Sequence, residues 1–113
     1  MKRVYEPLDP DDGRRVLVDR LWPRGITKEA AHVDEWLKDL TPSTELRKWY
    51  HEDPPGRRDE FAERYLHEMD GPEQRAALDR LRAIIKAGPA TLLTSAKDVE
   101  HSHVPVLARK LQA

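Results

Sequence analysis

The feature that most restricts the fold is a short, largely apolar run at residues 90–95, ATLLTS. The run lacks the alternation of apolar and polar residues that is typical of a strand with one solvent-exposed face. A continuous run of this length is typical of a central strand buried on both faces of a parallel sheet. Parallel neighbours must be joined by long crossover connections, which are usually helical. The run therefore predicts an α/β layer structure.

Two earlier segments have the composition of further strands. Residues 2–5 are partly β-branched or aromatic and precede a segment that prolines and Gly13 interrupt. Residues 15–21 alternate, with Val16 and Val18 on one side, and the proline and glycine of the next turn end this strand.

Apolar residues at helical spacing predict the connecting helices. Thr27 is the expected cap of a helix over residues 28–40, and Ser43 of a second helix over residues 44–51. A loop is expected over residues 52–58. The apolar stripe of the first helix consists of Ala30, Val33, Leu37 and Leu40.

The second half of the chain alternates helix, strand and helix. Helices are predicted over residues 59–69 and 73–87, and a final helix over residues 102–112 follows a polar loop. The helix over residues 59–69 is expected to bury Phe61, Tyr65 and Met69. The helix over residues 73–87 is expected to bury Ala77, Leu81, Ile84 and Ile85. This order predicts a small three-layer single domain over residues 1–113, α/β in class, whose short, mostly parallel sheet is flanked by helices.

Composition excludes several functional classes. The 113 residues hold 20 Lys plus Arg against 21 Asp plus Glu, so no whole-molecule field attracts polyanions and a nucleic-acid partner is disfavoured. The absence of Cys rules out disulfides and thiolate metal sites and fits a cytoplasmic location. No apolar run is long enough for a membrane span, and no signal peptide is expected. A homo-oligomer is compatible with the sequence.

Two loops leave the carboxyl ends of predicted strands, where open parallel sheets bind their ligands. We expect Arg20 or Arg24 of the first loop and Lys97 of the second to converge on the amino end of the final helix, which favours negative charge. Arginine and lysine together suit a phosphate or a carboxylate, and Trp22 can stack on a flat ring. In the simpler alternative, Asp19 and Arg20 only form ion pairs at the strand ends, and Trp22 belongs to the core.

Two further groups of residues are candidates. Arg47 and His51 share one side of the helix over residues 44–51 and can reach the same crevice, although a solvent-facing basic helix explains them as well. His101 and His103 suggest a metal site, but the segment offers only two imidazoles. We favour His101 either as an acid–base group or as a residue at the start of the final helix. Neither a Gly-rich phosphate loop nor a GxSxG elbow occurs.

The segments RVLVDRLWPRG, DEWLKDLTPSTELRKWYH, FAERY and TLLTSAKDVEHSH resemble the YeaO-like family of bacterial and archaeal proteins, domain of unknown function 488. The resemblance runs over nearly all of the chain and implies a small three-layer, cytoplasmic α/β domain without an established activity. Family members often carry Asn where this chain has Ser102. The family motif falls on Asp19, Arg20, Trp22, Pro23, Arg24, Gly25, Pro42, Ser43, Leu46, Arg47, Trp49, Lys97 and His101.

These observations predict a small-molecule site, enzymatic or regulatory, for an anionic ligand that bears a phosphate or resembles a nucleotide. The charge-neutralising residues are Arg20, Arg24, Arg47 and Lys97, with Ser43 as a hydrogen-bond donor, Trp22 as a packing surface and Asp19 or His101 as the proton-transfer group. No cofactor is predicted. The alternatives are a nucleic-acid or protein interaction module and a metal-binding protein that uses His101 and His103.

Overall fold

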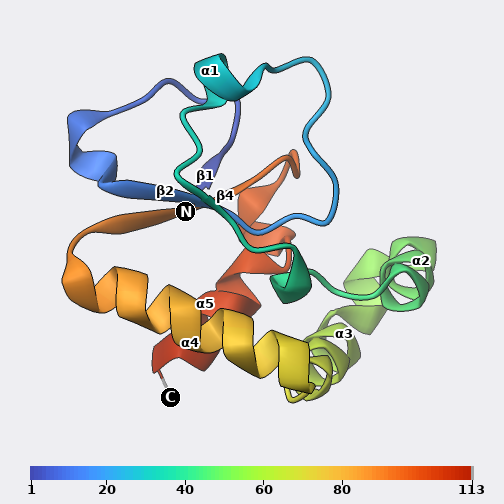
Figure 1. Ribbon diagram of the computed structural model, residues 1–113. Coiled ribbons are helices and arrows are strands. Elements are labelled where there is room, and N and C mark those ends of the chain that lie inside the picture. The colour runs from blue at the N-terminus through green and yellow to red at the C-terminus, as the bar shows by residue number, and fades with distance from the viewer. Residues whose placement is uncertain (113) are drawn as a thin grey trace.

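A computed structural model describes residues 1–112 and places four parallel strands in the middle of the molecule (Figure 1). The strands are β1 (Lys2–Arg3), β2 (Arg14–Leu17), β3 (Glu35–Trp36) and β4 (Ala90–Thr94), in the spatial order β1-β4-β2-β3. The apolar run at residues 90–95 thus forms a central strand, as predicted. The helical segment is also confirmed as the crossover between the neighbouring strands β2 and β4.

Helices cover both faces of the sheet, but unequally. The helices are α1 (Lys28–Ala31), α2 (Thr44–Glu52), α3 (Pro54–Glu68), α4 (Pro72–Ala87) and α5 (Val104–Gln112). Figure 1 shows α4 and α5 on one side of the sheet and α1 on the other. No helix within residues 1–112 is both long and apolar enough to cross a membrane.

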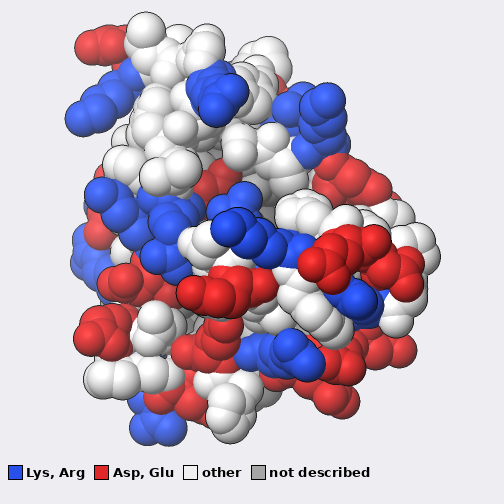
Figure 2. Space-filling view, turned by 90° about the vertical axis from the view of Figure 1, so that its right-hand side faces the viewer, with Lys and Arg blue, Asp and Glu red and all other residues white. Residues whose placement is uncertain are grey.

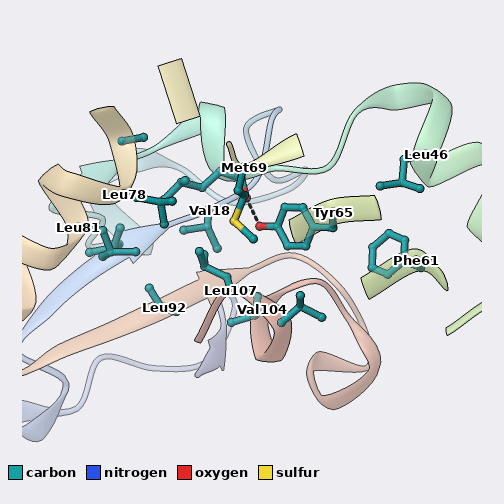
Figure 3. Packing of buried hydrophobic residues seen from close by; sticks show 14 of the residues in the cluster. Val18, Leu46, Phe61, Tyr65, Met69, Leu78, Leu81, Leu92, Val104 and Leu107 are labelled. Carbon is teal, nitrogen blue, oxygen red and sulfur yellow. Dashed lines mark hydrogen bonds between the residues drawn. The ribbon is translucent and has the colours of Figure 1, made fainter. Parts of the chain in front are cut away.

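The alternation of side chains along β2 and β4 divides the interior into two cores. Val16, Val18 and Leu92 face the long helices and join the main core, in which Figure 3 shows Val18, Tyr65 and Met69 close together. The Tyr65 hydroxyl donates a hydrogen bond to the Leu40 carbonyl there. On the other face, a smaller core comprises Val4, Leu17, Ala31 and Leu93, with Trp22, Ile26, Val33 and Trp36 packed against it.

The predicted helix over residues 28–40 is wrong beyond its first turn. Thr27 is the cap, as expected, but the chain leaves the helix at His32, whose φ of 51° is left-handed. Residues after it pair with β2 instead, and the amides of Asp34 and Leu37 donate to β2 carbonyl groups at 2.8 and 2.9 Å. The open edge of β2 needs hydrogen-bond partners, and this long-range requirement overrides the local helical spacing.

The loop predicted over residues 52–58 is wrong as well. Helix α3 begins at Pro54. Proline has no backbone N–H, but the N–H groups of a first turn have no acceptor within the helix, so proline costs no hydrogen bond there. Predicted core residues of α3 are buried, whereas Ile85 of α4 is 43% exposed and Leu78 is buried instead. The strand predicted over residues 15–21 also ends earlier, with its ladder closing at Leu17.

A charged cluster at the amino end of β2 was not anticipated. Arg15 is 1% exposed and donates to Asp12 at 2.6 Å and to the Ala31 carbonyl at 3.1 Å. Asp12 also pairs with Lys2 at 2.9 Å, and the hydrogen bond from Lys2 is the main reason that the pKa of Asp12 falls to about 2. This cluster ties α1 to the sheet at the end opposite the predicted site.

Candidate functional site

A cleft of about 830 Å³ lies at the carboxyl ends of β1, β2 and β4. Its walls come from the loops after these strands and from α2 and α3. The two loops that were expected to converge both line it. Seven of the predicted site residues line the cleft, namely Asp19, Arg20, Trp22, Arg24, Arg47, Lys97 and His101.

The cleft is rich in cations that have no acidic partner. Its exposed basic side chains are Arg20, Arg24, Arg47, Arg58 and Lys97, and within residues 1–112 none of them forms an ion pair with Asp or Glu. Figure 2, which looks onto this side of the molecule, shows several basic side chains in its upper and middle part, with acidic side chains among and below them. Since the total charge nearly cancels, this excess of positive charge is local to the cleft.

Asp19 holds the two central strands together at their tips. One carboxylate oxygen accepts from the Thr94 hydroxyl at 2.8 Å and the other from the Ser95 amide at 2.7 Å. Its backbone carbonyl accepts from Trp36 Nε1 at 2.6 Å. The side chain is largely buried, so these bonds fix where the first loop leaves β2 and where the second leaves β4. The geometry gives Asp19 a positioning role.

The turn after Asp19 is anchored at both sides of Trp22. The indole Nε1 donates to the Ile26 carbonyl at 2.8 Å, and the ring meets Trp36 edge-on with centroids 5.5 Å apart. The Tyr5 hydroxyl donates to the Arg24 carbonyl at 2.8 Å. These contacts hold the backbone of the turn, while the Arg24 side chain stays exposed along the cleft.

The two histidines of the second loop have different environments. His101 is exposed and its Nδ1 lies 2.5 Å from Asp98, and this hydrogen bond is the main reason that the pKa of Asp98 is lowered. With Nδ1 engaged, Nε2 is the nitrogen left for a ligand. Within residues 1–112, no group of three His, Cys, Asp or Glu side chains is arranged to hold a metal ion.

His103 lies deeper, with only 11% of its side chain exposed. Its Nε2 donates to the Val18 carbonyl at 2.7 Å, and the Tyr65 ring packs edge-on against the imidazole. Burial is the largest influence on the pKa of His103 and lowers it, and the Arg47 charge acts in the same direction. The hydrogen bond to the Val18 carbonyl and the charge of Asp19, 3.8 Å away, oppose this shift without reversing it. His103 is therefore a neutral imidazole near pH 7 that supports the end of β2.

Ser43 is the predicted site residue that does not line the cleft. Its hydroxyl caps α2 by accepting from the Leu46 amide at 3.2 Å and donates to Glu68 at 2.6 Å. It lines a smaller adjoining cavity of about 260 Å³, which shares Arg20 and Thr41 with the cleft. A ligand-binding role for Ser43 stays a prediction.

Several cleft residues were missed from the sequence. Arg3 ends β1, so the strand-end argument that selected Lys97 applies to it equally, and its Nε donates to the Ala96 carbonyl at 3.0 Å. Arg58 was hidden because its segment was expected to be a loop, whereas α3 brings it to the cleft. Sequence alone offers no comparable signal for the burial of His103.

Comparison with known proteins identifies the family of the chain. The sequence model described as "Inactive DUF488-N3 subclade" matches residues 1–113. The chain belongs to the DUF488 family. The family resemblance seen in the sequence is thereby confirmed.

Relatives of this DUF488 protein are similar over almost their whole length. The uncharacterized protein YeaO of Escherichia coli is 49% identical over 112 residues, covering 99% of this chain and 95% of YeaO. The uncharacterized protein Rv3073c of Mycobacterium tuberculosis is 50% identical over 109 residues, covering 96% of this chain and 89% of the relative. No solved structure matches this chain.

Proposed function

We propose that the cleft of this DUF488 protein binds a small anionic ligand that bears a phosphate or resembles a nucleotide. The observation that carries the proposal is the set of five exposed cations that line one cleft without acidic partners within residues 1–112. Unpaired like charges around one cleft repel each other, and a bound anion relieves that repulsion. The family description, an inactive subclade, favours binding over turnover.

The proposed roles follow from the geometry of each side chain. Arg24 and Lys97 contact the ligand from the two strand-end loops, and Arg47 contacts it from α2. Trp22 lines the cleft, and its indole N–H already donates to the Ile26 carbonyl, so the ring offers an apolar surface without an unpaired donor. His101, oriented by Asp98, is the group at the cleft best suited to exchange a proton with the ligand.

The proposal is tested by titrating inorganic phosphate and sulfate into the protein and into the Arg24→Ala/Lys97→Ala variant by calorimetry. Solvent screening reduces each charge-assisted contact to about 1 kcal/mol, so the variant should bind about thirtyfold more weakly. The matched control is Arg82→Ala/Lys86→Ala, which removes one Arg and one Lys from the exposed face of α4. Equal affinities for wild type and the cleft variant would remove the site.

A further inference from the structure

The size of the cleft is the first observation that restricts its ligand. A volume of about 830 Å³ lies in the upper part of the range of roughly 300–1,000 Å³ that is typical of sites for drug-sized ligands. A single phosphate or carboxylate group fills only a small part of such a space. The ligand therefore extends beyond one anionic group.

The basic residues of the cleft come from two different parts of the fold. Arg3, Arg20, Arg24 and Lys97 lie at the strand ends, where Arg3 donates to the Ala96 carbonyl and the Tyr5 hydroxyl donates to the Arg24 carbonyl; we call this the strand-end wall. The second set, which we call the helix wall, consists of Arg47 and His51 of α2 and Arg58 of α3.

Acidic groups at the cleft leave both walls positive. The lining includes only two carboxylates among residues 1–112, Asp19 and Asp98. Asp19 accepts hydrogen bonds from Thr94 and Ser95, and Asp98 is bound by His101 at 2.5 Å. Both carboxylates keep their negative charge, but six Lys and Arg side chains line the same cleft, so the excess is positive. Arg58 lies close enough to Asp98 to contribute weakly to lowering the pKa of that carboxyl, so its charge is offset in part. Arg47 forms no ion pair with Asp or Glu within residues 1–112.

We propose that the ligand of this cleft carries two separated anionic groups, one held by the strand-end wall and the other by the helix wall. This inference rests on the proposed function and specifies its ligand class as a small bisphosphate, or a phosphate joined to a carboxylate. A ligand with one anionic group neutralises one wall and leaves the other uncompensated. Joining two anions makes the second contact intramolecular, which raises affinity without requiring a new kind of interaction.

The surface between the walls suits the linker. Trp22, Pro23 and Leu21 contribute apolar area to the cleft, and the Leu21 side chain is 74% exposed. Apolar surface therefore lies beside the cations in the same cleft. The linker is therefore expected to be at least partly apolar or planar, as a sugar-linked ring or a short carbon chain would be.

The test compares bisphosphates with matched monophosphates. Propane-, butane- and hexane-diyl bisphosphates are titrated into the full chain by calorimetry, beside propyl, butyl and hexyl phosphate and inorganic phosphate. The variants are Arg24→Ala/Lys97→Ala for the strand-end wall and Arg47→Ala/Arg58→Ala for the helix wall, with Arg82→Ala/Lys86→Ala as control. All four wall side chains are exposed, so the variants should melt close to wild type.

We expect at least one bisphosphate to bind about thirtyfold more tightly than its monophosphate partner, and each wall variant to abolish most of that gain. The inference fails if no bisphosphate exceeds its partner, or if only one wall variant weakens it. If the inference fails but phosphate still binds and its affinity depends on the strand-end wall, the proposed function stands. If phosphate does not bind at all, both the inference and the proposed function are overturned. A single-stranded thymidine hexanucleotide that binds more tightly than every bisphosphate, with steep salt dependence, would also overturn the inference.

Discussion

Replacing Asp19 with alanine should destabilise the protein strongly, because its carboxylate joins the tips of β2 and β4. The two hydrogen bonds that it accepts, at 2.8 and 2.7 Å, each contribute about 1.5–3 kcal/mol when the acceptor is charged. Water from the cleft can reach the vacated position and replace part of this. We therefore expect Asp19→Ala to lower the free energy of unfolding by about 2–4 kcal/mol, and Tm by roughly 8–16 °C for a domain of this size.

Urea and thermal denaturation followed by circular dichroism measure this change, with Asp79→Ala as a control for loss of an exposed carboxylate. A double-mutant cycle with Thr94→Val isolates one of the two bonds and should give a coupling free energy of about 1–2 kcal/mol. An Asp19→Ala protein within about 0.5 kcal/mol of wild type, or a cycle without coupling, would refute the positioning role. Asp19 would then remain a candidate for proton transfer alone.

Two other predictions concern the frame around the cleft. Burial lowers the pKa of His103 in the folded protein below its usual value of about 6.5. Between these two pKa values the unfolded state binds more protons than the folded state, so the free energy of unfolding should fall as pH decreases below about 6.5. His103→Gln, which retains a donor for the Val18 carbonyl, should flatten that slope in denaturation series across pH. Gly13 has a φ of 64°, and an added Cβ would lie 2.2 Å from the Pro89 carbonyl oxygen, so Gly13→Ala should lose about 2–5 kcal/mol. Gly88→Ala, where backbone is extended and nothing lies within 4 Å, should stay within about 1 kcal/mol of wild type in the same melts.

Local patterns predicted most elements whose partners are close in sequence. The Ser43 cap, the apolar face of α3 and the strand at residues 90–95 follow from spacing and turn chemistry, which act over a few residues. The same reasoning located the cleft, because loops that follow parallel strands leave at one edge of the sheet. It failed at residues 28–40, where apolar spacing fitted a helix but an open strand edge required pairing.

The sequence by itself determined the α/β class, the central strand and the loops whose cations line the cleft. Only the tertiary structure decided that residues 35–36 form an edge strand, that Arg15 is buried against Asp12, and that Asp19 binds across to Thr94 and Ser95. It also decided that α2 and α3 bring a second set of cations to the cleft that the strand-end loops line. The physical reason is distance along the chain: each of these outcomes except the Arg15 ion pair joins residues far apart in sequence, and their hydrogen-bonding and charge requirements exist only once the sheet has brought them together.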